Sequence, residues 1–84
     1  MPHVFHSEAY KRLLELLVSA RKRKGLNQTQ LGRRIGRGQT FVSKIELGER
    51  RIDVVEFLIL ADILDIDVHE MLREVGAAIT SRKM

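Results

Sequence analysis

Residues 28–45 read QTQLGRRIGRGQTFVSKI and predict two short helices that meet at a tight turn. Leu31 and Ile35 lie four residues apart and share one helical face. Gly32, beside Leu31, carries no side chain that would keep a second helix at a distance. Gly36 can adopt the positive φ that a sharp turn requires. We therefore expect the first of the two helices to end at Gly36.

The second helix of this stretch should present a polar face to solvent. Val42 and Ile45 repeat at a spacing of three and supply an inward face. Four hydrogen-bonding side chains then point outward: Gln39, Thr40, Ser43 and Lys44. Two helices joined in this way form a helix-turn-helix, whose second helix lies in the major groove of DNA. The four outward residues are therefore candidates for contacts with base edges.

Length and composition indicate one small helical domain. The chain has 84 residues, which suffice for a single hydrophobic core. It contains no cysteine, so packing of helices and not disulfides must hold it, which suits a reducing cytoplasm. No run approaches eighteen apolar residues, and the first residues lack a basic segment followed by an apolar one. We expect a soluble, cytoplasmic protein with no membrane partner.

The charge is distributed unevenly along the chain. The net charge is +4, but residues 1–52 hold twelve Lys and Arg against four Asp and Glu, and residues 53–84 hold three against seven. The basic part contains the predicted helix-turn-helix. This favours double-stranded DNA as partner, because phosphate contacts supply most of the non-specific binding energy. A merely solvated basic face would give the same count.

Helix start and stop residues divide the rest of the chain. Ser7, Asn27 and Asp53 are candidate N-caps, and Gly25 and Gly48 are candidate stops. They predict helices at 8 to about 24, 28–35, 39–47, 54–64 and 68 to about 75. The predicted organisation is a flexible arm at 1–6, a DNA-binding domain at 7–76 and a C-terminal extension at 77–84, which either continues the last helix or frays.

The helix expected at 54–64 is too apolar for a single buried stripe. One stripe can face the core with Val54, Phe57, Leu58, Ala61 and Leu64. A second stripe, Val55, Ile59 and Ile63, is then left uncovered. A second copy of the chain is the simplest cover and would make a homodimer on a palindromic site, with two recognition helices roughly 34 Å apart. The alternative is that the C-terminal segment folds over the stripe.

With these residues assigned, the chain resembles the lambda-repressor-like, Cro-type helix-turn-helix proteins of the XRE family. The resemblance covers roughly residues 13–75 and rests on several segments in order: RKRKGLNQTQLG, IG at the turn, QTFVSKIELGER and FLILADILDID. It implies an all-α, compact five-helix lambda-repressor-like domain. It also implies a transcriptional regulator or repressor that is encoded by a bacterium or a phage and associated with the nucleoid.

The resemblance assigns roles to particular residues. Gln28 matches a position that binds backbone phosphate, Gln39 and Thr40 match positions that meet base edges, and Ser43 and Lys44 would lie further along the groove. Arg21 and Glu46 match positions that form an ion pair bracing the first helix against the third. A glutamine amide can also pair bidentately with adenine, which makes Gln39 the strongest candidate for base reading.

Backbone contacts are expected from residues at the helix starts, the turn and the following loop: Asn27, Gln28, Arg37, Phe41, Arg50 and Arg51. Three positions depart from the family pattern. Arg37 replaces an apolar residue, and Gly32 replaces an alanine, which loosens its helix by up to about 1 kcal/mol. Phe41 is bulkier than usual, so that a DNA contact and packing against the neighbouring helix are both open.

Metal binding and catalysis have little support in the sequence. His3 and His6 lie three apart and His69 is isolated, but no cysteine or suitably placed carboxylate completes a site. The serines lack a plausible His and Asp arrangement, and there is no glycine-rich phosphate loop. We expect neither an enzyme nor a cofactor.

Two main functions remain after these exclusions, and non-specific binding to the nucleoid is a third. The first is a sequence-specific DNA-binding transcriptional regulator that acts as a homodimer on a palindromic operator. The alternative is an antitoxin or adaptor-type module whose main partner is another protein, docked on the stripe of Val55, Ile59 and Ile63.

Overall fold

The computed structural model describes the backbone of residues 7–83 and the side chains of residues 7–79. Five helices follow one another over this range: α1 (Glu8–Arg23), α2 (Gln28–Ile35), α3 (Gln39–Glu46), α4 (Val54–Leu64) and α5 (Val68–Lys83). None of the described residues lies in a β-strand, so the predicted all-α class is confirmed. No helix in this range is both long and apolar enough to cross a membrane. The arm expected at residues 1–6 lies outside the described residues.

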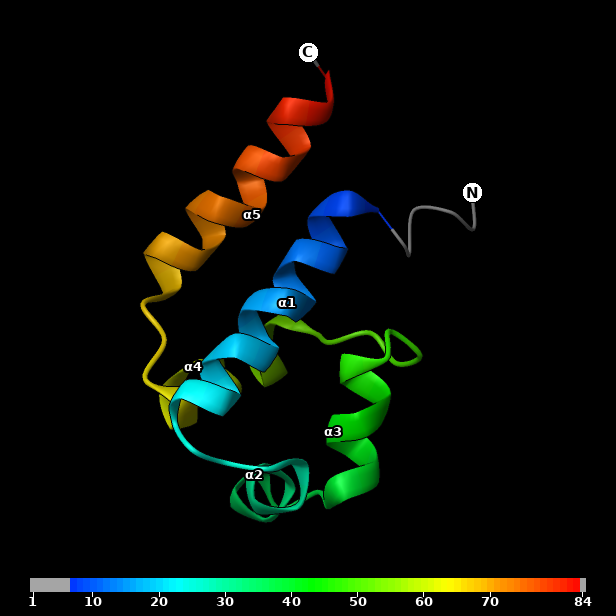
Figure 1. Ribbon diagram of the computed structural model, residues 1–84, viewed down its shortest axis with the longest axis vertical. Coiled ribbons are helices and arrows are strands. Elements are labelled where there is room, and N and C mark those ends of the chain that lie inside the picture. Colours follow the sequence, from blue (N-terminus) through cyan, green and yellow to red (C-terminus); the bar gives the residue numbers. More distant parts are fainter. Residues whose placement is uncertain (1–6, 84) are drawn as a thin grey trace.

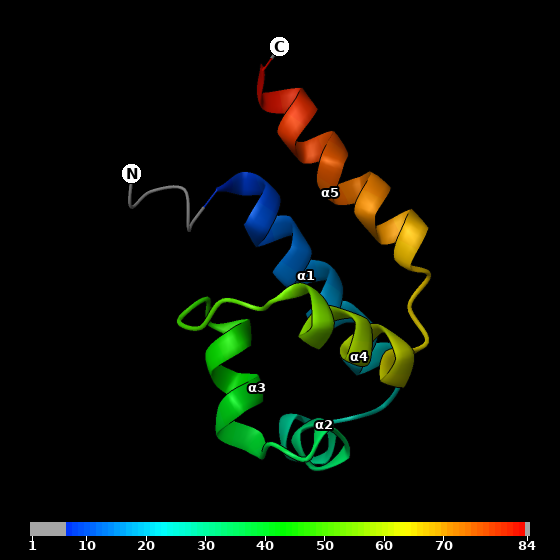
Figure 2. The same cartoon turned by 180° about the vertical axis from the view of Figure 1, so that it is seen from behind.

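The helix-turn-helix occupies one end of the molecule. α1 and α5 lie side by side and run in opposite directions, and α2 and α3 sit together away from the C-terminal end of α5 (Figure 1). Seen from behind, α4 lies between the α2–α3 pair and α5 (Figure 2). α3 also packs on α1, and α2 on α4. The two helices of the motif are therefore supported by the rest of the domain.

Side-chain caps explain where the helices begin. The Ser7 hydroxyl accepts from the Tyr10 backbone N–H at 3.1 Å. Asn27 accepts from the backbone N–H of Gln30 at 2.7 Å, and the Gln30 side chain accepts from the Asn27 N–H at 2.8 Å. Asp53 and Glu56 form the same reciprocal capping box at the start of α4. The predicted starts at 8, 28 and 54 are confirmed.

One helix end differs from the prediction, and another settles an alternative. α3 ends at Glu46, one residue early, and Leu47 is its C-cap. α5 continues through the expected extension to Lys83, so of the two alternatives for this segment the helical one is confirmed. Gly76 does not end it, because Val75 and the residues before it pack on α1, and the Arg12 Nη2 lies 2.7 Å from the Glu74 Oε1. This packing outweighs the cost of about 1 kcal/mol for a glycine within a helix.

The core joins all five helices. The larger group of buried side chains gathers residues of α1 to α4: Ala20, Leu31, Phe41, Val42, Ile45, Leu60 and Leu64. A smaller group connects α1, α4 and α5 through Leu17, Phe57 and Met71. Burying these apolar side chains is the main term that stabilises the domain.

The buried face of α4 differs from the predicted one. Phe57, Ala61 and Leu64 are buried as expected, but Leu60 is buried in place of Val54 and Leu58, which are exposed. The prediction was wrong at these positions because α4 is apolar on nearly every side. Its periodicity therefore does not define one inward direction, and the packing partners choose it.

Gly32 lets α2 approach the start of α3. A Cβ at this position would overlap the carbonyl carbon and oxygen of Gly38. The Gly32 carbonyl accepts hydrogen bonds from the backbone N–H groups of Arg37 at 2.9 Å and Gly38 at 3.2 Å. Gly36 ends α2 with φ of 78°, as predicted for the corner. Gly32 is therefore required by the turn and does more than loosen α2.

Candidate nucleic-acid interface

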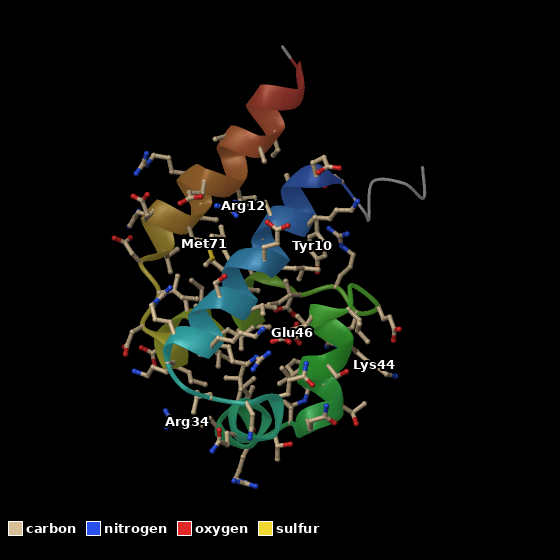
Figure 3. The ribbon with its side chains drawn as sticks, in the orientation of Figure 1. Tyr10, Arg12, Arg34, Lys44, Glu46 and Met71 are labelled. Atoms are coloured by element: carbon tan, nitrogen blue, oxygen red, sulfur yellow. The ribbon has the colours of Figure 1, made fainter. Side chains whose placement is uncertain are left out.

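α3 presents the expected polar face. Gln39, Thr40 and Lys44 are exposed and Ser43 is half-buried, while the opposite side of the helix is buried in the core. In Figure 3 the Lys44 side chain points away from the body of the molecule. The arrangement follows from the helical period, which places residues 39, 40, 43 and 44 on one side. These side chains are free to reach a groove of DNA.

A buried ion pair ties α3 to α1. The Arg21 Nε and Nη2 donate to the two carboxylate oxygens of Glu46 at 2.7 and 3.0 Å, and the Arg21 Nη1 donates to the Leu26 carbonyl at 2.9 Å. The two side chains are only 10% and 12% exposed. Figure 3 shows Glu46 between α1 and α3. A bidentate pair of this kind fixes the relative orientation of the two side chains and also adds binding energy.

A chain of hydrogen bonds runs from this ion pair to the surface. The Gln28 Nε2 donates to Glu46 at 2.8 Å, and the Gln28 Oε1 accepts from the Gln39 Nε2 at 2.7 Å. Because a carboxylate can only accept, the Gln28 amide must turn its nitrogen toward Glu46 and its oxygen toward Gln39. Gln39 therefore keeps its amide oxygen and one N–H for another partner. The family resemblance assigns Gln28 to backbone phosphate and does not indicate this chain of hydrogen bonds.

Phe41 lies inside a cluster of charged side chains. The ring is 8% exposed and belongs to the core, so the packing alternative describes it and we do not carry it forward as a DNA contact. The guanidinium carbons of Arg37 and Arg50 lie 4.2 and 4.7 Å from the centre of the ring. Guanidinium groups at such distances are attracted to the face of the ring. They also cover its outer surface.

Glu56 of α4 pairs with both of these arginines. Its oxygens accept from the Arg50 Nη1 and Nη2 at 2.9 and 2.8 Å, and the Arg37 Nη1 lies 3.8 Å away. The hydrogen bonds from Arg50, followed by the Asp53 backbone N–H, hold the pKa of Glu56 below its ordinary value. The same contact raises the pKa of Arg50. The capping-box pattern predicts a backbone role for Glu56, but no sequence signal predicts its arginine partners.

The other expected backbone contacts are Asn27 and Arg51, and both are exposed. Asn27 is exposed at the start of α2, although its side chain is engaged in the capping box. Arg51 is exposed and places its guanidinium 4.3 Å from the centre of the Tyr10 ring. Arg33 and Arg34, in the last turn of α2, are exposed cations that the sequence analysis did not single out.

The structure changes the stripe expected on α4. Val55 and Ile59 are 64% and 44% exposed, but Ile63 packs partly against the core. The exposed Val54 and Leu58 adjoin them, so the uncovered surface, here called the outer face of α4, consists of Val54, Val55, Leu58 and Ile59. Four exposed apolar side chains on eleven residues are unusual for a surface that meets only water.

The described part of the chain shows no metal site at a histidine. His3 and His6 lie outside the described residues, and His69 is exposed on α5. Within the described part of the chain, no group of three His, Cys, Asp or Glu side chains gathers closely enough to hold a metal ion.

Comparisons with known proteins agree with this geometry. A family model described as helix-turn-helix matches residues 17–71. A solved structure, the XRE-family like protein from Pseudomonas syringae pv. tomato str. DC3000, is 39% identical to this chain. The similarity covers 90% of this chain and 93% of that one, with a TM-score of 0.79. The chain belongs to the XRE family of helix-turn-helix proteins. No curated protein matches it.

Membership of the XRE family confirms the resemblance found in the sequence and the five-helix fold. The family consists of DNA-binding regulators and not of enzymes. The exposed polar face of α3 and the cations around it are therefore the candidate DNA-binding surface of this XRE-family protein.

Proposed function

We propose that this protein is a sequence-specific transcriptional regulator that binds a palindromic operator as a homodimer. The observation that carries the proposal is the polar face of α3, whose Gln39 is held by a hydrogen-bond chain anchored on the buried pair of Arg21 and Glu46. A side chain held in one orientation before binding loses less freedom when it binds. Such a side chain suits base reading.

α3 would enter the major groove and read bases with Gln39, Thr40, Ser43 and Lys44. The free amide oxygen and N–H of Gln39 match the N6 donor and N7 acceptor of adenine. Contacts to the sugar-phosphate backbone would fix the register and come from Asn27, Gln28, Arg37 and Arg51. Lys44 is a cation on the same face and reaches either a guanine or a phosphate.

The outer face of α4 supports the homodimer. A two-fold dimer would bury its four apolar side chains against the same four on the partner, as an isologous interface requires. Each subunit would then read one half-site, with half-sites roughly 34 Å apart. Occupancy of the operator would block or recruit RNA polymerase, which places the protein in the cytoplasm, at the nucleoid of a bacterium or on the genome of a phage.

Selection of binding sites from random duplex DNA tests this function. The selected sequences should converge on two inverted half-sites whose centres lie about ten base pairs, or a multiple of that, apart. Adenine should recur at one position in each half-site. Selection that returns no consensus sequence would overturn sequence-specific binding, and a single unrepeated site would overturn the dimer on a palindrome.

The same exposed apolar face favours one alternative, an antitoxin or adaptor-type module that binds another protein through Val54, Val55, Leu58 and Ile59. Sedimentation equilibrium of the purified chain separates the two. A dimer supports the regulator as proposed, whereas a monomer at tens of micromolar leaves the face for a different protein.

A further inference from the structure

Two arginines lie over the buried ring of Phe41, and one carboxylate, Glu56, pairs with both of them. Arg37 comes from the turn before α3, Arg50 from the loop after it, and Glu56 from α4. Both guanidinium groups lie over the ring, and Glu56 pairs with both. The sequence suggested that both arginines contact the DNA backbone, but their surroundings are not equivalent.

Arg50 is already engaged. A guanidinium has five N–H donors. Arg50 uses three of them, two on the oxygens of Glu56 and one on the Arg51 carbonyl at 2.9 Å. The side chain of Glu56 is 16% exposed and that of Arg50 is 36% exposed, so salt screens this partly buried pair less than it would an exposed one. A phosphate approaching Arg50 would meet a pair of zero net charge.

Glu56 holds Arg37 more weakly than it holds Arg50. Its Nη1 lies 3.8 Å from the nearer oxygen of Glu56, which is beyond hydrogen-bond length, and half of its side chain (49%) is exposed. The Phe41 ring still supports its guanidinium at 4.2 Å. Arg37 is therefore both oriented and available for an anion.

We propose that Glu56 determines which arginine of this cluster contacts the DNA backbone: it withholds Arg50 and leaves Arg37 as the phosphate contact. This inference rests on the proposed DNA-binding function. Glu56 acts here as a positioning residue, which touches no DNA and sets the number of cations that its neighbours offer. Each phosphate contact adds about 0.9 to the magnitude of the negative slope of log K against log salt, here called the salt slope, so the number of contacts can be measured.

The experiment measures binding to a duplex of random sequence over a series of salt concentrations, since backbone contacts carry no sequence information. Arg37→Gln should lower the salt slope by about 0.9, whereas Arg50→Gln, with the same change of charge, should leave it unchanged. Glu56→Gln frees Arg50 and should raise the slope by about 0.9. A glutamine at this position can still complete the capping box with Asp53.

Two controls separate release of Arg50 from a simple change of net charge. The double variant Glu56→Gln/Arg50→Gln should return to the wild-type slope, because no freed cation remains. Asp62→Asn removes one exposed carboxylate from α4, away from the cluster, and should leave the slope unchanged. Urea unfolding of each variant verifies that it is folded under the binding conditions.

Several results would overturn the inference. An Arg50→Gln slope reduced as much as that of Arg37→Gln would show that Arg50 already contacts phosphate, and this comparison decides even if Glu56→Gln does not fold. A Glu56→Gln slope equal to wild type would show that Glu56 withholds nothing. Wild-type protein that binds no DNA would overturn the proposed function as well, whereas binding without sequence preference leaves these slopes readable.

Discussion

At the scale of single residues, the polar face of α3 is held by a chain of hydrogen bonds that begins at a buried ion pair. Arg21 and Glu46 fix the Gln28 amide, and Gln28 in turn fixes Gln39. The sequence and the family resemblance single out each of these residues. Neither shows that the residues are joined by one chain of hydrogen bonds. The contact between Gln28 and Gln39 joins two helices, and only the angle at the turn brings them within reach.

Gln28→Ala should therefore weaken base reading without removing a base contact. Gln39 would lose its partner and adopt several orientations, so the preference for adenine at its position should fall by up to about 1 to 3 kcal/mol, the size of one bidentate contact. Competition between the selected duplex and one with that base pair replaced measures the preference. Thr29→Ala, at the neighbouring exposed position on α2, is the control and should leave it unchanged.

Glu56 gives stability a dependence on pH. Because hydrogen bonds from Arg50 hold its pKa below the ordinary value, the folded protein keeps Glu56 ionised to a lower pH than the unfolded chain does. This contribution is complete above the unfolded pKa of about 4.3 and is lost as pH falls through the folded pKa. The free energy of unfolding should differ between wild type and Glu56→Gln more at pH 7 than at pH 3. A difference that stays constant over this range would contradict the account of Glu56.

At the scale of elements, caps and glycines were predictable and packing directions were not. Ser7, Asn27 and Asp53 mark helix starts because their side chains bond to backbone groups only three residues away. The buried face of α4 and the length of α5 depend on neighbours far away in sequence. Local pattern therefore placed Val54 and Leu58 in the core, where the structure has Leu60.

The turn gives a prediction at this scale. Gly32→Ala should lower the free energy of unfolding by about 1 to 3 kcal/mol or more, because its methyl group would overlap the backbone of Gly38. Gly76→Ala is the matched control: nothing lies within 4 Å of a Cβ there, so it should raise stability by up to about 1 kcal/mol. Urea unfolding curves of the two variants should shift in opposite directions. Equal shifts would contradict the close approach of α2 and α3.

At the scale of the whole molecule, the proposed function uses two surfaces, the basic helix-turn-helix end for DNA and the apolar outer face of α4 for a second copy of the chain. The charge asymmetry of the sequence predicts the first, and the excess of apolar residues in α4 predicts the second. The sequence predicts that Val55 and Ile59 are uncovered, and both are exposed. It could not predict that Ile63 is drawn into the core while Val54 and Leu58 are not.

Ile59→Asp tests the second surface. Burying a carboxylate in a two-fold apolar interface places two such charges close together, so the variant should sediment as a monomer at concentrations where wild type is a dimer. Its affinity for the selected palindrome should fall, because a monomer can bind only one half-site and loses the gain from binding both at once. Leu47→Asp, at an exposed apolar residue that lines a hollow against α1, should sediment like wild type. An Ile59→Asp variant that remains dimeric would place the interface elsewhere.

The most direct test of sequence-specific recognition is the affinity for the selected palindrome against that for a scrambled duplex of the same length and base composition, at one salt concentration. The fixed polar face of α3 predicts that the selected duplex binds more tightly by about a thousandfold or more. Equal affinity for the two duplexes would contradict it.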